Sequence, residues 1–204
     1  MDLEKHKIKL ILTEDQLGTI PKSKEIFKNY ITEKARDQKT PEELQQLQIE
    51  EVASVEELEE KGWTGFHVDE NGLFIYEYMI KGFLKEAGNT MKEIVGIKNI
   101  KSKLNNLVFV APRKMYFKRN GDYIKSADGV FERSLRVDTP MGPRVALARS
   151  EFVNAGAELD IEVTIVPNKE ITWKRLLQIF EYGSLKGLGQ FRNGGFGRFT
   201  FEAN

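Results

Sequence analysis

The sequence predicts a single α+β domain over residues 1–204, in which a sheet carries two helices on one face. Two amphipathic helical segments, at 79–94 and 172–186, each follow residues with the character of a strand. Further strands open and close the chain, at 5–12 and 198–202. Strand, helix, hairpin-rich middle, helix and closing strand is the order of a split βαβ unit.

The N-terminal part combines the opening strand with acidic helical sequence. Residues 5–12 alternate polar and apolar side chains before becoming wholly apolar, as in a strand that enters a core. Pro41 stands at a first helical position before two glutamates, and Ser54 with Glu57 forms a capping box. We therefore expect an acidic helical insertion over about 22–62.

A hairpin and a helix are predicted next. Asn71-Gly72 is a hairpin-type turn signal, and a strand follows it at 73–76. Apolar side chains at helical spacing then indicate a helix over 79–94, interrupted at Gly88. The apolar face of this helix should pack on a sheet.

The region after this helix is basic and rich in turns. A compact strand is predicted over 107–112. We then expect a basic, hairpin-rich insertion over about 113–150, with one turn at Asn120-Gly121 and later short strands broken at 140–143.

The C-terminal part gives the clearest local signals. Residues 158–166 alternate almost strictly and predict a strand. Thr172 is a suitable N-cap for the helix at 172–186. A glycine-rich segment then leads to the closing strand at 198–202.

The net charge of zero hides an uneven distribution. Residues 1–100 carry 14 Lys and Arg against 20 Asp and Glu, whereas residues 101–204 carry 17 against 11. A phosphate-bearing partner is therefore expected at the second half. The balanced total argues against the indiscriminate DNA binding of a very basic chain.

Composition also limits the chemistry. The chain has no cysteine and no apolar run of about 18 residues, so we expect a cytoplasmic protein without membrane contact. His6 and His67 are the only histidines and neither has a serine or second histidine at catalytic spacing. We expect no catalytic residues, no metal, no cofactor and no enzyme activity, with the acidic pairs Glu14-Asp15 and Asp69-Glu70 as solvated charges.

The glycine-rich segment from Tyr182 to Phe199 is the strongest candidate site. Glycines interleaved with cations suit a loop whose backbone approaches another chain while the cations meet its phosphates. Phe191 and Phe196 either stack on bases or belong to the core, and the glycines alternatively only form a tight turn. The candidate nucleic-acid-binding residues here are Lys186, Gly187, Gly189, Arg192, Gly194, Gly195, Gly197 and Arg198.

A second candidate surface lies in the basic middle of the chain. Its cations alternate with Tyr116, Phe117 and Tyr123, a mixture typical of single-strand nucleic-acid surfaces. Arginines favour phosphate because the guanidinium group binds it in a bidentate way. The alternative is an ordinary solvated face. The candidate residues are Arg113, Lys114, Arg133, Arg136 and Arg144.

These motifs resemble the RAMP superfamily, the proteins that build CRISPR RNA-guided complexes. Gly187-Leu-Gly189 and the run from Gly194 to Phe199, between a helix and a short strand, match its C-terminal glycine-rich signature. Residues 78–85, 153–162 and 17–19 resemble further segments of the family in the same order. The resemblance spans nearly the whole chain and is strongest from residue 150 onward.

The resemblance implies a ferredoxin-like or RRM-like fold, RNA binding and assembly side by side along a guide RNA. It adds Lys81, in the 78–85 segment, to the nucleic-acid-binding candidates. The first loop, 13–21, does not match the pattern that supplies a target-cleaving aspartate, so cleavage is not implied. The chain is most similar in kind to solitary RAMP-like proteins of phages and mobile elements.

Two functions follow as alternatives. In the first, the protein is a non-catalytic RNA-binding RAMP-like protein that is a subunit of a CRISPR-type complex or an antagonist to it. Its partners would be single-stranded RNA and either further copies of itself or CRISPR-type subunits. In the second, a phage-encoded anti-defence protein mimics a RAMP subunit without binding RNA.

Overall fold

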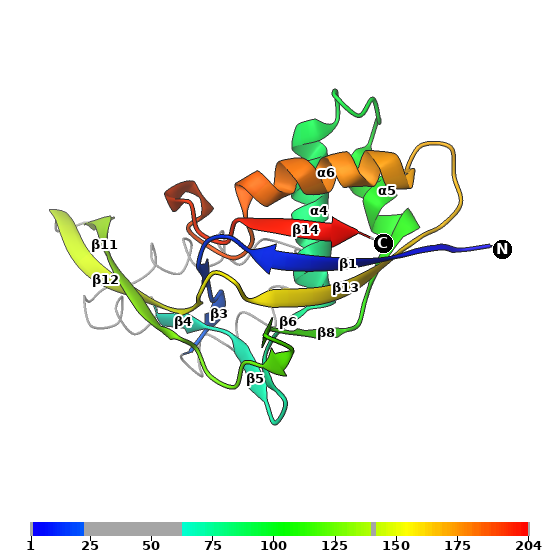
Figure 1. Ribbon diagram of the computed structural model, residues 1–204. Coiled ribbons are helices and arrows are strands. Elements are labelled where there is room, and N and C mark those ends of the chain that lie inside the picture. Colours follow the sequence, from blue (N-terminus) through cyan, green and yellow to red (C-terminus); the bar gives the residue numbers. More distant parts are fainter. Residues whose placement is uncertain (1, 23–62, 140–141, 204) are drawn as a thin grey trace.

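The computed structural model describes residues 2–22, 63–139 and 142–203, and Figure 1 shows their arrangement. The helical insertion expected at 22–62 lies outside the described residues, except for Lys22 at its start. Within the described part the fold is mixed α/β, with all of the strands in three sheets and three α-helices beside them.

The largest sheet lies at the centre of the molecule. β1 lies between β13 and β14 and is antiparallel to both, and β7 is antiparallel to β13 on its other side. The described order is therefore β7–β13–β1–β14. β9 pairs with the first residue of β13, Glu158, and β10 pairs with β9. Its strands are β1 (Glu4–Leu12), β7 (Val108–Ala111), β9 (Lys118–Arg119), β10 (Asp122–Tyr123), β13 (Glu158–Ile165) and β14 (Phe199–Ala203).

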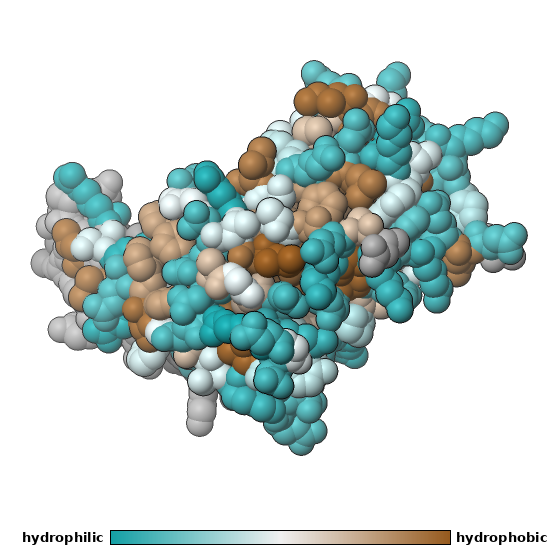
Figure 2. Space-filling model, viewed as in Figure 1, coloured by the Kyte–Doolittle hydropathy of each residue, from teal (hydrophilic) through white to brown (hydrophobic). Residues whose placement is uncertain are grey.

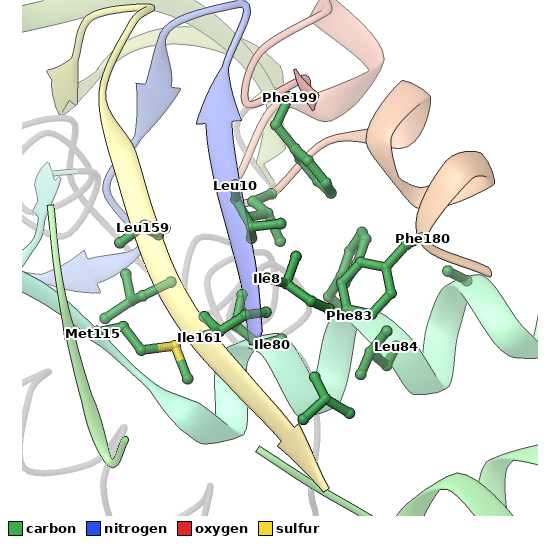
Figure 3. Packing of buried hydrophobic residues seen from close by; sticks show 14 of the residues in the cluster. Ile8, Leu10, Ile80, Phe83, Leu84, Met115, Leu159, Ile161, Phe180 and Phe199 are labelled. Atoms are coloured by element: carbon green, nitrogen blue, oxygen red, sulfur yellow. The ribbon is translucent and has the colours of Figure 1, made fainter. Parts of the chain in front are cut away.

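Two helices, α4 (Glu77–Met91) and α6 (Trp173–Lys186), cover one face of this sheet. Both expected helices are thus present, and the Thr172 side chain caps α6 by accepting a hydrogen bond from the Arg175 N–H at 3.4 Å. Figure 3 shows how Phe83 of α4, Phe180 of α6 and Phe199 of β14 meet over the strands. The Phe83 and Phe199 rings lie 5.7 Å apart and edge to face, a favourable aromatic geometry.

The helix α5 (Ile100–Leu107) was not predicted, and Gly88 does not interrupt α4. Gly88 is buried inside α4, where a Cβ would lie 2.6 Å from Leu104 Cδ1. Its missing side chain lets α5 pack against α4. The local signal for α5 is the spacing of Ile100, Leu104 and Leu107, of which the first two are fully buried.

A small sheet of three antiparallel strands carries the turn predicted at Asn71-Gly72, with Glu70 and Asn71 as its loop and Gly72 already in the strand, paired with Asp69. It consists of β5 (His67–Asp69), β6 (Gly72–Tyr76) and β8 (Lys114–Tyr116), with β6 in the middle. The second predicted turn is also present, because Asn120 and Gly121 have φ values of 53° and 89° between β9 and β10. Positive φ at both central residues is typical of a two-residue type I′ hairpin turn.

The strands before residue 153 are longer than expected, and they are separated within the expected 140–143 segment, after Thr139. β11 (Gly129–Thr139) and β12 (Gly142–Val153) form one long hairpin, paired continuously from Gly129 and Phe152 to Thr139 and Gly142. Figure 1 shows this hairpin projecting from the body of the molecule. Its base joins three short strands: β2 (Gln16–Leu17), β3 (Ile20–Pro21) and β4 (Trp63–Gly65).

Hydrophilic residues cover most of the side of the molecule seen in Figure 2, with hydrophobic residues in separate patches among them. The core beneath is contiguous, because residues of β1, β13, α4 and α6 belong to one buried hydrophobic cluster. No helix in the described residues is both long and apolar enough to cross a membrane.

Candidate nucleic-acid interface

Three of the five glycines in the glycine-rich loop approach the chain's own backbone. Gly187, Gly189 and Gly197 have φ values of 87°, 80° and 71°. A Cβ at Gly187 would lie 2.5 Å from the Phe196 carbonyl oxygen, and one at Gly197 would overlap the carbonyl group of Leu188. For these three residues the tight-turn alternative accounts for the glycine.

Gly194 and Gly195 have different surroundings. A Cβ at Gly194 would lie 2.6 Å from an edge carbon of the Phe191 ring, so this glycine makes room for the ring. Gly195 has a φ of 91° and no heavy atom within 4 Å of the position of a Cβ. Of the loop glycines, Gly195 is therefore the one that leaves space for another molecule at the backbone.

A buried amide ties the loop to the base of the long hairpin. Gln190 is 2% exposed, and its Nε2 donates to Gly18 O at 2.6 Å and to Ser150 Oγ at 2.7 Å. The Thr64 hydroxyl lies 2.5 Å from the same nitrogen and 3.0 Å from the Ser150 hydroxyl. This network, which the sequence did not reveal, joins the loop to β12, to β4 and to the turn after β2.

The residues between Gln190 and Gly197 form the tip of the loop, and their phenylalanines pack on β11. The Phe196 ring lies 4.8 Å from that of Phe131, and the Phe191 ring lies 5.7 Å from that of Phe196. The Arg133 guanidinium lies 4.3 Å from the centre of the Phe191 ring, which remains 39% exposed. Neither Phe191 nor Phe196 is in a strand, because β14 begins at Phe199.

We call this group the loop–hairpin surface. Its members come from the tip and from one face of β11, where alternate residues point to the same side. They are Phe131, Arg133, Phe191, Gly195 and Phe196.

Lys186, the last residue of α6, and Arg192 of the loop both bind an acid of α4. Lys186 Nζ lies 2.7 Å from Glu86 Oε1, and an Arg192 nitrogen lies 2.8 Å from Glu86 Oε2. Burial by itself raises the pKa of Glu86, but the hydrogen bonds from Arg192 and Lys186 outweigh it and hold that pKa below its usual range. Since the Arg192 side chain is only 13% exposed, these two cations hold the loop on α4 and do not project from it.

The other arginines do not form a single stripe. Arg133 and Arg136 lie on opposite faces of β11, because three positions separate them along the strand. Arg136 is exposed, and Arg198 is exposed at the start of β14. Arg144 pairs with Val137 in the hairpin, and its side chain lies outside the described part of the structure.

The remaining predicted cations belong to other elements. Lys81 of α4 donates to Val108 O and lies 5.1 Å from the Phe109 ring, and burial, with Lys85 nearby, lowers its pKa to about 8. Arg113 and Lys114 lie in and beside β8, in the three-stranded sheet. The fold therefore divides the candidate residues among the loop, the long hairpin, α4 and the small sheet.

The outer face of the central sheet, opposite the helices, pairs its cations with carboxylates. Lys5 lies 3.6 Å from Glu162, and Lys9 lies 3.3 Å from Glu158. Strand alternation places one aromatic residue, Phe109, on this face of β7, β13, β1 and β14. An RRM binds RNA through aromatic rings on the corresponding face, so the charge pairing here does not favour that mode of binding.

The expectation that the acidic pairs are solvated charges is wrong for Asp15 and Asp69, which have structural partners. Asp15 Oδ1 accepts a hydrogen bond from Ala155 N at 3.0 Å, and Asp15 O accepts one from Gly197 N at 2.7 Å. Asp69 lies 2.6 Å from Lys114 Nζ. Within residues 2–22, 63–139 and 142–203, no group of three acidic or histidine side chains is arranged to hold a metal ion.

Comparison with known proteins identifies similar folds only. No model of a protein family matches the sequence, and no curated protein matches it. A chain from the cryo-EM structure of the Type III-B Cmr-beta bound to cognate target RNA matches with a TM-score of 0.54 and 11% identity, over 98% of this chain and 60% of that one. A chain of a Type IV-B CRISPR complex matches with a TM-score of 0.49 and 12% identity, over 98% and 90%.

The protein therefore shares its fold with a chain of the Cmr-beta complex. It spans 60% of the length of that chain. At 11% identity the likeness concerns the arrangement of the elements and does not extend to particular side chains.

Proposed function

We propose that the central sheet and its two helices are the ferredoxin-like element of a RAMP-type protein. β1 and β7 run in the same direction with β13 between them, and α4 lies in the connection that joins them. β13 and β14 are related in the same way across β1, with α6 in their connection. Two interleaved split βαβ units of this kind support the ferredoxin-like assignment.

We further propose that the protein is a non-catalytic RNA-binding component of a CRISPR-type complex, with the loop–hairpin surface as its RNA contact. The observation that carries this proposal is the exposed Phe191 ring beneath the Arg133 guanidinium at 4.3 Å. An unpaired base stacks on such a ring, and the guanidinium binds a phosphate or stacks on the base. The fold shared with a chain of an RNA-bound CRISPR complex agrees with this function.

The anchoring of the loop makes the contact efficient. The Gln190 network and the backbone contacts of Gly187 and Gly197 fix the tip before RNA arrives. Binding to a preorganised loop avoids the entropy cost of ordering it, so more of the stacking energy remains as affinity.

A second function is favoured by the pairing of the cations. Lys186 and Arg192 bind Glu86, so two cations of the expected RNA surface are already neutralised, and Arg149 of β12 is likewise paired with Glu132 at 2.9 Å. A protein that mimics a RAMP subunit and docks on a CRISPR-type complex needs the fold but not free cations. This alternative predicts no salt-dependent RNA binding by the isolated protein.

Fluorescence anisotropy with labelled single-stranded oligouridylate at several salt concentrations separates the two functions. Phe191→Leu removes the exposed ring and should lower affinity by about 5- to 100-fold, the effect of one lost base stack. Phe109→Leu is the matched control, because Phe109 is an exposed phenylalanine on β7 outside the loop–hairpin surface. Equal affinities for the two variants and the unmodified protein, or no binding by any of them, would reject RNA binding at the loop.

A further inference from the structure

The three-stranded sheet β5–β6–β8 has an aromatic outer face. Phe74 and Tyr76 of β6 alternate with Ile75, which belongs to the main hydrophobic core, and Phe74 is also buried, at 4% exposed, on the other face of the strand. Tyr116 of β8 is paired with Phe74 and therefore lies on the same face. Met115, the neighbour of Tyr116, is buried on the inner side.

The rings on this face touch one another in a continuous run, which we call the aromatic face. Its ring centres are 5.5 Å apart between Tyr78 and Tyr76, 5.2 Å between Tyr76 and Phe74, and 5.5 Å between Phe74 and Tyr116. Tyr123 of β10 continues it at 5.2 Å from Tyr116. The members are His67, Phe74, Tyr76, Tyr78, Tyr116 and Tyr123.

Cations lie over these rings. Lys114 Nζ is 4.7 Å from the centre of the Phe74 ring, and Lys118 Nζ is 5.4 Å from that of Tyr123. The exposed Arg113 guanidinium is 5.8 Å from the Tyr76 ring. Cations above aromatic faces are attracted by the ring electrons. Lys114 and Lys118 are also paired with carboxylates, at 2.6 Å from Asp69 and 2.8 Å from Asp160, so the exposed Arg113 guanidinium is the cation best placed to meet a phosphate.

Asp69 fixes the position of this group. Its carboxylate lies 2.6 Å from Lys114 Nζ and accepts a hydrogen bond from the Tyr116 hydroxyl at 2.8 Å. Hydrogen bonds from Lys114, Tyr116 and the Asn71 N–H together lower the pKa of Asp69 to about 2. The carboxylate is therefore charged at neutral pH and holds both side chains in one arrangement.

The rings toward the two ends of the run are more accessible than the one in its middle. Tyr123 is 45% exposed at one end, and Tyr76 and Tyr78 are half-buried at the other, whereas Phe74 between them is 4% exposed. A continuous group of aromatic rings at the surface generally marks a binding site. Interleaved rings and cations are the composition that single-stranded nucleic acid requires, because bases stack on rings while phosphates meet the cations.

We infer that the aromatic face is a second RNA contact, which binds unpaired bases of a single strand by stacking near Tyr76 and Tyr123. Arg113 contacts an adjoining phosphate. The inference rests on the proposed RNA-binding function but uses a surface on a different sheet, and it names unpaired bases as the recognised groups.

The test uses the full chain and two labelled probes, single-stranded oligouridylate and an abasic oligomer of the same length. The double variant Tyr76→Leu/Tyr123→Leu should bind oligouridylate about 5- to 100-fold more weakly, with an unchanged salt slope, because stacking involves no phosphate. Its affinity for the abasic oligomer should equal that of the unmodified protein. Phe109→Leu again serves as the control with one exposed ring removed elsewhere.

Failure of this inference and failure of the proposed function give different results. If Phe191→Leu weakens oligouridylate binding and the tyrosine variant does not, the aromatic face is not an RNA contact and the loop–hairpin surface still is. If the unmodified protein binds no RNA, both are rejected, and docking of a protein partner explains the aromatic face. Photocrosslinking of the unmodified protein to 5-bromouridine RNA covers the case of a misfolded variant, since absence of crosslinks at Tyr76 and Tyr123 overturns the inference.

Discussion

The glycine-rich loop consists of two parts that share a composition and differ in role. The anchored part, Gly187–Gln190 with Gly197, lies backbone against backbone and contributes a buried amide. The tip, Phe191–Phe196, has one glycine with open space beside it and an exposed ring. The number of glycines in a loop therefore does not show whether the loop binds a ligand. The atoms around each glycine show whether it serves a tight turn or leaves space for another molecule.

Gly197→Ala should have the largest effect on stability. The substitution forces a Cβ into the Leu188 carbonyl group at a φ of 71°, so both steric overlap and left-handed strain oppose it. We expect the free energy of unfolding to fall by about 3–5 kcal/mol, measured by urea denaturation.

Gly121→Ala is the control for Gly197→Ala. Gly121 has a φ of 89° but no atom within 4 Å of a Cβ, so this variant carries the backbone strain alone and should lose only about 1–2 kcal/mol. Equal losses for the two variants would show that the close approach at Gly197 contributes nothing.

Gln190→Leu should have the next largest effect. It leaves Gly18 O and the hydroxyls of Ser150 and Thr64 without their common donor in a buried site. We expect a loss of about 1–3 kcal/mol by the same denaturation assay. Adding Ser150→Ala should cost less than the sum of the two single changes, because both remove one network, and strict additivity would contradict that coupling.

Gly195→Ala probes the tip instead of the anchored part. With open space around the Cβ position, only the φ of 91° opposes the change, and the expected loss of stability is about 1–2 kcal/mol. RNA affinity should fall together with it, because the backbone at Gly195 is where RNA is proposed to approach. A variant that loses stability and binds labelled oligouridylate as well as the unmodified protein would remove Gly195 from the interface.

Glu86→Gln should have the smallest effect on stability, about 1 kcal/mol or less, since the ion pairs are partly exposed. It releases Lys186 and Arg192, so RNA affinity should rise and the salt slope should steepen by about 0.7 for each new phosphate contact. Weaker RNA binding by Glu86→Gln would contradict this prediction and show that ordering of the loop by the ion pairs contributes more to affinity than the two released cations.

Glu86 also makes the stability of the protein depend on pH, in a direction that follows from its lowered pKa. Because the fold lowers the pKa of Glu86, its stabilising contribution is present above the ordinary pKa of the carboxyl and is lost as pH falls through the lowered value. Unmodified protein should therefore lose more stability on acidification than Glu86→Gln, in thermal melts recorded from neutral to acid pH. Identical pH profiles would contradict this sign.

Sequence patterns predicted the elements whose signals are local. β1, β13 and α6 have periodicities and a cap that depend on neighbouring residues alone, and they lie where those patterns place them. The β11–β12 strands are separated within the predicted 140–143 segment, but they are longer than predicted and Pro143 is inside β12, where it pairs with Asp138. α5 was missed because it is short and directly precedes a stronger strand signal.

The sequence pointed to several residues of the candidate site but not to the contacts among them. Glu86 and Arg192 are 106 positions apart, and Phe131, which packs against the loop, comes from the β11–β12 hairpin. Such pairings depend on the packing of the whole chain, so neither periodicity nor spacing contains them. The open position at Gly195 likewise follows from tertiary packing, whereas the need for glycine at positive φ is a local property.

The positions of Glu4 in β1 and Ala203 in β14 have a practical consequence for handling the protein. Because β1 and β14 are antiparallel neighbours, Glu4 and Ala203 lie at the same end of the sheet, away from the glycine-rich loop, as Figure 1 shows. A sensor surface or a fluorophore attached through either of these ends would leave the loop and the long hairpin facing solution. The same neighbourhood suits circular permutation, in which a short linker joins Ala203 to Glu4 and the chain is opened at the exposed Asn120-Gly121 turn.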